Sequence, residues 1–166
     1  MPLPLPLING QRCDAGSYTI TIDGLRYFGV KSLDYSDSLE PGKVKGTSPV
    51  VLGRTVGSYD TSGSIELFIE EALDFESQLA SSAAVQFPQG GGNGLGQAVF
   101  TINVTVYELS TGFGTNDTLV GCRVKSVSHT MPTNGGGDPA TKKYDLDILS
   151  VLRNGRSLLV TPVPIR

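Results

Sequence analysis

The sequence predicts a mainly β fold: an antiparallel barrel or sandwich flanked by one α-helix, with long loops for assembly. Three observations predict it. Apolar and polar residues alternate with a period of two in most segments, one segment has a helical period, and the 166 residues include 21 glycines and 10 prolines, which favour turns. The length suits one compact domain with its own core, so we expect residues 1–166 to form a single domain.

Alternating segments predict the strands. The first is residues 17–23, after which Asp23-Gly24 predicts a turn into residues 26–35. The same alternation predicts strands at residues 64–70, 97–109, 118–130 and 142–152. Asn154-Gly155 predicts a hairpin turn into residues 156–160. One apolar and one polar face per segment is typical of half-buried antiparallel strands.

Residues 71–84 are predicted to form the helix. Ala72, Phe75, Leu79 and Ala83 recur at helical spacing and lie on one face. Acidic residues crowd the first turns, where the helix dipole favours negative charge. Pro88 and the glycines that follow it predict the end of the helix.

Two regions without regular periodicity are predicted to serve assembly. Residues 37–62 are expected to form a long irregular loop, which a compact domain seldom keeps without a use. Residues 1–16 begin with alternating prolines and leucines, a pattern that fits either an extended arm lying against a neighbour or a frayed terminus. The candidate interface residues in these regions are Leu3, Leu5, Leu7, Leu39, Val44, Val50, Val51, Leu52, Arg54, Thr55 and Tyr59.

The charge balance excludes a strongly basic nucleic-acid clamp. The chain has 13 basic and 16 acidic residues and a net charge of −3, so it has little positive charge with which to neutralise phosphates. Only 17% of the residues are charged, which leaves much uncharged surface for a partner to cover. No segment is apolar and long enough to predict a membrane span.

Residues suited to catalysis or metal binding are scarce. The single histidine, His129, lies in an alternating segment with no nucleophile placed beside it, so a structural role on a strand face is favoured. Cys13, Cys122 and one histidine do not supply a metal site. Asp145 and Asp147 are expected to be solvated carboxylates on one strand face. We therefore expect no enzyme, no cofactor and no metal.

Three motifs follow one another within residues 43–75: Gly53-Arg54-Thr55-Val56-Gly57, Gly63-Ser64-Ile65-Glu66-Leu67 and Glu70-Glu71-Ala72. In this order they resemble the tail tube proteins of contractile-tailed bacteriophages, which share their fold with the tubes of contractile injection systems and type VI secretion. Residues 145–155 also resemble the closing strand of that family, with Arg153 where an aromatic residue is common.

The resemblance implies a structural protein. Six copies would close a ring by β-pairing between neighbours, and rings would stack into a hollow conduit for ejection of the viral genome. The expected partners are further copies of the chain and the sheath, baseplate, tape-measure and tail-terminator proteins. DNA would pass through without tight binding, which a net acidic subunit favours. The tube would belong to the virion and assemble in the host cytoplasm.

Other functions remain open from the sequence. One is a secreted tube subunit of a bacterial contractile secretion system. Another is a monomeric β-barrel that binds a small ligand in its interior. An enzyme is more remote, and turnover that requires His129 would support it.

Overall fold

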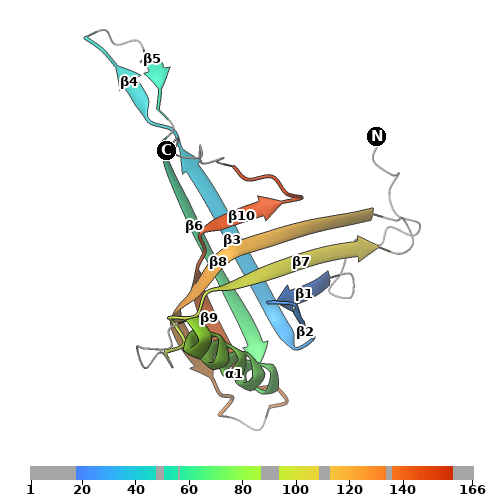
Figure 1. Ribbon diagram of the computed structural model, residues 1–166. Coiled ribbons are helices and arrows are strands. Elements are labelled where there is room, and N and C mark those ends of the chain that lie inside the picture. Colours follow the sequence, from blue (N-terminus) through green and yellow to red (C-terminus); the bar gives the residue numbers. More distant parts are fainter. Residues whose placement is uncertain are drawn as a thin grey trace.

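A computed structural model describes residues 18–47, 51–55, 57–86, 94–108, 113–133 and 136–158 (Figure 1). The elements in chain order are β1 (Tyr18–Ile22), β2 (Leu25–Tyr27), β3 (Val30–Glu40), β4 (Lys43–Lys45), β5 (Val51–Arg54), β6 (Ser58–Phe68), α1 (Ile69–Gln86), β7 (Phe100–Glu108), β8 (Phe113–Thr130), β9 (Thr141–Asp147) and β10 (Ser150–Arg153).

The strands form a continuous antiparallel sheet that folds into two layers (Figure 1). Their order is β2-β1-β7-β8-β9-β6-β3, and β10 pairs with β8. Strands β4 and β5 form a separate two-stranded sheet that projects beyond the ends of β3 and β6. The predicted mainly β, antiparallel fold with one flanking helix is therefore confirmed.

Strand β8 belongs to both layers. Residues 113–122 pair with β7, and residues 123–130 pair with β9. Gly121, with a φ of +67°, lies where the strand passes from one layer to the other, and a Cβ placed there would come within 2.8 Å of the Leu149 side chain. Only glycine fits this bend without strain. We call β1, β2, β7, β10 and residues 113–122 the first sheet, and β3, β6, β9 and residues 123–130 the second sheet.

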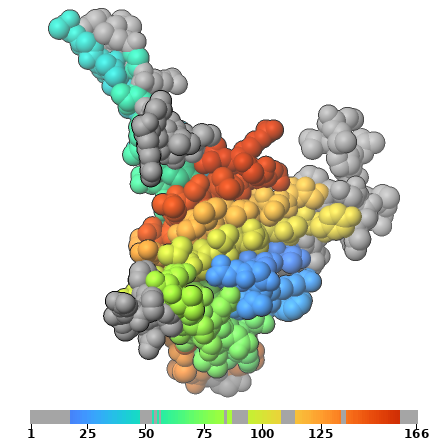
Figure 2. Space-filling model, viewed as in Figure 1, coloured from blue at the N-terminus to red at the C-terminus, as the bar shows by residue number. Residues whose placement is uncertain are grey.

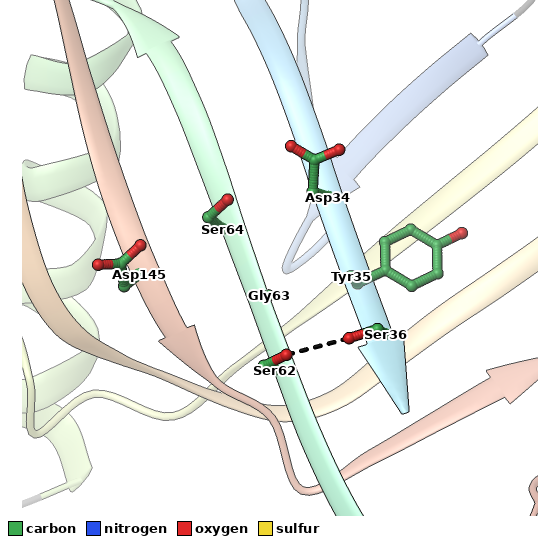
Figure 3. A pocket seen from close by; sticks show the side chains of 7 residues that line it. All are labelled: Asp34, Tyr35, Ser36, Ser62, Gly63, Ser64 and Asp145. Carbon is green, nitrogen blue, oxygen red and sulfur yellow. Dashed lines mark hydrogen bonds between the residues drawn. The ribbon is translucent and has the colours of Figure 1, made fainter. Parts of the chain in front are cut away.

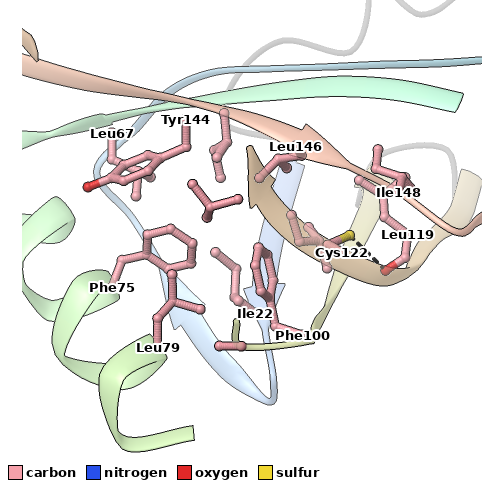
Figure 4. Packing of buried hydrophobic residues seen from close by; sticks show 14 of the residues in the cluster. Ile22, Leu67, Phe75, Leu79, Phe100, Leu119, Cys122, Tyr144, Leu146 and Ile148 are labelled. Carbon is pink, nitrogen blue, oxygen red and sulfur yellow. Dashed lines mark hydrogen bonds between the residues drawn. The ribbon is translucent and has the colours of Figure 1, made fainter. Parts of the chain in front are cut away.

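The core lies between the two sheets and is closed by α1 (Figure 4). Phe75 of α1 is fully buried at its centre. Its ring makes edge contacts with the rings of Tyr27, Phe100 and Tyr144 at centroid distances of 6.2, 5.4 and 5.1 Å. Aromatic rings favour this geometry because the positive edge of one meets the negative face of another. The helical face predicted from the sequence, Ala72, Phe75, Leu79 and Ala83, is buried as expected.

A partly buried carboxylate ties α1 to the second sheet. Glu76 accepts hydrogen bonds of 2.8 Å from both the Lys142 ammonium and the Tyr144 hydroxyl of β9. Burial alone would raise the pKa of Glu76, but these two hydrogen bonds hold it below its usual value. The helix is thus held against the sheet by a charged contact as well as by packing.

Residues 37–62 do not form the irregular loop that the sequence analysis predicts. Strand β3 continues to Glu40 and β6 starts at Ser58, so the two strands stay paired through Asp37–Thr61 and Leu39–Tyr59. The remaining residues of the region include the β4–β5 hairpin. Many serines and aspartates mask the alternation here, and pairing between the strands stabilises them despite a low intrinsic β propensity.

The strand predicted at residues 142–152 is also wrong as one element. Strand β9 ends at Asp147, and β10 begins at Ser150 on a different partner. Between them, the Leu149 amide donates to the Val120 carbonyl of β8 at 3.0 Å. This hydrogen bond lies where the chain leaves β9 in the second sheet and enters β10 in the first sheet. The alternation continues across the break, so it gives no sign of the change of partner.

Both predicted hairpin turns form. Asp23 and Gly24 have φ values of +48° and +84°, and Asn154 and Gly155 have +52° and +78°. Two successive residues with positive φ are the signature of the hairpin turn that fits twisted strands. The extended N-terminal segment predicted at residues 1–16 lies outside the described residues, and so do the last residues of the strand predicted at 156–160.

Candidate assembly surfaces

The second sheet has two unpaired long edges within the described part of the chain. One belongs to β3, which pairs only with β6, and the other belongs to residues 123–130 of β8, which pair only with β9. Each successive pair of the four strands is antiparallel. The two edges therefore run in opposite directions, and each offers main-chain groups to an incoming strand.

Exposed apolar side chains lie on both edges at the same position along the strand direction. The start of β3 is aligned with the end of β8 through paired residues on β6 and β9. Phe28, which is 75% exposed, precedes β3, and the Arg26 guanidinium lies 4.6 Å from its ring centroid. Met131, 65% exposed, follows β8, and Val127 is exposed within it. Each edge therefore presents exposed apolar side chains beside its unpaired main-chain groups.

The β4–β5 hairpin and the ends of β3 and β6 that carry it form the arm, defined as the described residues between 36 and 62. Figure 2 shows the hairpin, in cyan and green, standing clear of the body. The Thr55 amide donates to the Gly42 carbonyl at 2.8 Å, which closes the base of the hairpin. Val44 on β4 is an exposed apolar residue. The arm can therefore reach a molecule that the body does not touch.

A cluster of polar side chains joins the base of the arm to the first sheet. Arg153 of β10 forms an ion pair with Asp37 of β3, with 2.6 Å between Nη2 and Oδ1. The Tyr59 hydroxyl of β6 donates to Asp37 Oδ2 at 3.1 Å and accepts from the Val151 amide of β10 at 3.2 Å. The Arg153 hydrogen bond holds the pKa of Asp37 below its usual value. Both strands of the arm are thus tied to β10.

The face of the second sheet that points away from the core carries hydroxyl groups and carboxylates. We call this the serine–carboxylate face; its members are Ser32, Asp34, Ser36, Ser62, Ser64, Glu66, Ser126, Ser128, Lys143 and Asp145. Glu66 is paired with Lys31 at 3.1 Å. Among the described residues of this face, Asp34, Asp145 and Lys143 form no ion pair, so its carboxylates exceed its ammonium groups by a small margin.

A hollow of about 300 Å³ opens on this face, where Asp34, Ser36, Ser62, Ser64 and Asp145 line it (Figure 3). Asp34 and Asp145 lie on either side of Ser64 in one row across β3, β6 and β9. The row continues onto β8, where the Ser126 hydroxyl donates to Asp145 at 2.6 Å. The hollow is open, polar and acidic, which makes it unsuited to an apolar ligand or a polyanion.

Neither a protein-family model nor a curated protein matches the sequence. Solved structures do match. A chain of the extended sheath–tube complex of PVC, an extracellular contractile injection system, has 10% identity and a TM-score of 0.57, with 86% of this chain and 90% of that chain covered. The anti-feeding prophage (AFP) tube terminating cap has 9% identity and a TM-score of 0.60, with 86% and 91% covered. The SPP1 tail tube has 10% identity and a TM-score of 0.54, with 87% and 80% covered.

These matches extend over most of each chain and include a phage tail tube by that name. The chain has the tail tube fold. The resemblance in fold that the sequence motifs imply is therefore confirmed, and this chain carries its two free strand edges, its arm and its serine–carboxylate face on that fold.

The candidate interface residues lie in several places on the tail tube fold. Leu39 and Tyr59 face each other across β3 and β6, and Tyr59 is engaged within the subunit by Asp37 and Val151. Val44 lies on β4 opposite Gly53. The backbone of β5 contains Val51, Leu52 and Arg54, and Thr55 follows it at the base of the hairpin. Leu3, Leu5, Leu7 and Val50 lie outside the described residues.

Sequence reasoning missed the residues at the free edges and at the base of the arm. Phe28 lies inside the strand predicted at residues 26–35 and Met131 directly follows the one predicted at 118–130, and a single exposed apolar residue carries no signal there. Asp37 and Arg153 are far apart in the sequence, and no local pattern relates them.

The groups considered for catalysis remain dispersed. His129 is exposed on β8, across from Lys142. Cys122 is a free thiol whose burial raises its pKa to about 12. In the parts of the chain described, no three histidine, cysteine or acidic side chains gather as a metal site. No helix in those parts has the length and apolar character to cross a membrane.

Proposed function

We propose that the chain is the structural subunit of a phage tail tube, and that its hexameric rings stack into a hollow conduit for ejection of the viral genome. The observation that carries this proposal is the pair of free, oppositely directed edges on one four-stranded sheet. An edge that runs one way on one copy pairs antiparallel with the other edge of the next copy. A head-to-tail contact of this kind closes a ring when the rotation between copies permits it.

The dimensions of such a ring suit a conduit. Six copies of a four-stranded sheet make a barrel of about 24 strands, which leaves an aqueous channel. At a strand spacing of about 4.8 Å, the backbone diameter is at least about 37 Å. The core, the first sheet and α1 cover one face of the second sheet, so the serine–carboxylate face is the one left to line the channel.

The chemistry of that face suits the passage of DNA. Phosphates bind proteins by displacing counterions onto basic side chains. The row of Asp34, Ser64, Asp145 and Ser126 offers carboxylates and hydroxyl groups instead. A duplex in the channel is therefore repelled from the wall at this level and slides on hydrated groups.

The arm is the element that we assign to ring stacking, together with the candidate interface residues on it and the leucines of residues 1–16. Sheath, baseplate, tape-measure and tail-terminator proteins are the expected partners, the role is structural and not enzymatic, and the tube belongs to the virion after assembly in the host cytoplasm. The PVC and AFP chains favour a second candidate, a tube of a contractile injection or secretion system that carries another cargo.

Negative-stain microscopy and sedimentation of the purified protein test the proposal. We expect rings and tubes. A sample that stays monomeric at high concentration contradicts it, and a monomer stabilised by a small ligand supports the ligand-binding barrel instead. Sheath and tape-measure genes beside the coding sequence separate a phage tail from a secretion system.

Charged substitutions at the free edges are expected to prevent ring closure. Phe28→Glu and Met131→Glu each place a carboxylate where a neighbouring copy covers apolar surface. Burial of such a side chain contributes about 1.5–3 kcal/mol, and every interface of the ring loses it. Sedimentation should show monomers for both variants. Leu149→Glu is the matched control, because Leu149 is equally exposed but is bonded to the middle of β8; loss of rings there too would count against the edge assignment.

Reversing the charge of the channel wall is expected to make the tube bind DNA. Tubes of the Asp34→Lys, Asp145→Lys double variant gain lysines at one level of the channel. We expect a linear duplex to cosediment with them at least about tenfold more strongly than with the original tubes, and less so as salt rises. Asp34→Asn with Asp145→Asn is the neutral control. Equal retention of closed circular DNA, which cannot thread the channel, would place the binding outside it.

A further inference from the structure

We propose that the ion pair between Asp37 and Arg153 is a positioning contact that fixes the direction in which the arm leaves the body, and so sets how readily one ring engages the next. The inference rests on the proposed function, because it takes the arm as the stacking element. It assigns a role to Arg153, a residue outside the arm and outside the two free edges.

The contacts of the arm support this role. Beyond Asp37, β3 and β6 are paired with each other, and the described contacts to the first sheet come from β10 and the segment before it. Arg153 holds β3 through Asp37. The Val151 amide holds β6 through the Tyr59 hydroxyl, and the Thr61 hydroxyl donates to the Ile148 carbonyl. A two-stranded ribbon is flexible on its own, so these attachments decide its direction.

The ion pair is the strongest of these attachments. The Asp37 side chain is only 1% exposed, whereas that of Arg153 is 43% exposed. Removal of the guanidinium leaves a buried carboxylate without its charge partner, a more severe change than loss of a neutral hydrogen bond. A planar guanidinium holds a carboxylate in a defined orientation, which a lysine ammonium does not.

A small change of direction at Asp37 becomes a large displacement at the hairpin. Lys45, at the end of β4, is eight residues further along the chain. That is about 25 Å of extended backbone, so a tilt of about 10° moves the hairpin by about 4 Å. This displacement is larger than the tolerance of a packed interface, whereas residues 30–35 of β3, which lie at the level of the β8 edge, belong to the body and are not displaced.

The test separates ring closure from tube growth. Arg153→Ala, Arg153→Lys and Asp37→Asn are compared with the original chain by sedimentation, and the protein concentration at which tubes appear is measured. We expect rings in all of them, and an increase of about tenfold in the critical concentration for tubes in Arg153→Ala and Asp37→Asn, with a smaller increase in Arg153→Lys. The double variant Asp37→Asn, Arg153→Gln should be no worse than Asp37→Asn alone, because one contact is lost in both.

Gln86→Ala is the control. It removes the exposed hydrogen bonds between the end of α1 and Val99, away from the arm and from both free edges, and it should leave tube growth unchanged. Tubes of the Arg153 variants at the original critical concentration would overturn the positioning role. Loss of rings together with tubes would also overturn it, since the pair would then serve the whole fold. If the original chain forms no rings, the proposed function itself fails.

Discussion

Replacement of residues 43–54 by the dipeptide Asn-Gly is expected to give a protein that closes rings but does not stack them into tubes. The change removes β4, β5 and the residues between them, which we assign to contact with the next ring. Gly42 and Thr55 are already joined by a 2.8 Å hydrogen bond, so a two-residue turn closes the shortened arm without moving β3 or β6. The second sheet keeps both of its free edges.

Electron microscopy measures this outcome directly, with rings scored against tubes over a range of protein concentrations. Circular dichroism should remain that of a β protein. Val44→Asp is a milder version, which places a charge on an exposed apolar residue of the hairpin and should lengthen the delay before tubes appear. Normal tubes from the shortened chain would show that stacking uses other surfaces.

Phe75→Ala is expected to cause the largest loss of stability of any single substitution considered for this chain. The ring is fully buried and contacts three other aromatic rings. Its removal leaves a cavity and removes apolar contacts with side chains of α1 and of both sheets. The free energy of unfolding should therefore fall by about 3–5 kcal/mol. The melting temperature should fall by about 10 °C for a chain of this size.

Urea and thermal unfolding at one fixed protein concentration measure the effect, because assembly adds to apparent stability. Leu73→Ala is the control on the same helix. Leu73 is mostly exposed, and its truncation should change stability by less than about 0.5 kcal/mol. Similar losses for both variants would mean that Phe75 is not the centre of the core.

The sequence was sufficient for elements whose cause is local. The helix is a clear case, since Ala72, Phe75, Leu79 and Ala83 repeat at one spacing and all four are buried. The turns at Asp23-Gly24 and Asn154-Gly155 are another, because two positive φ values favour these residue types. In each instance the residues within one or two turns of the chain determine the structure.

Elements whose cause is distant were not predictable in this way. The ends of β3 and β6 are rich in serine and aspartate, and what holds them extended is pairing with each other and with Arg153. The break between β9 and β10 depends on Val120 of β8. For the same reason, the sequence pointed to residues 37–62 as a contact region but could not reveal the free edges, since an edge exists only once the strand order is known.

The passage of β8 through both sheets has a mechanical consequence. Its 18 residues span about 60 Å of backbone, with one half in the layer that carries β7 and the other half forming a free edge of the second sheet. In the proposed ring, a pull on the first sheet would therefore reach the contact between neighbouring copies along the covalent backbone of one strand, independently of the packing of the core. The two sheets of each copy would resist sliding over one another, because one continuous strand belongs to both.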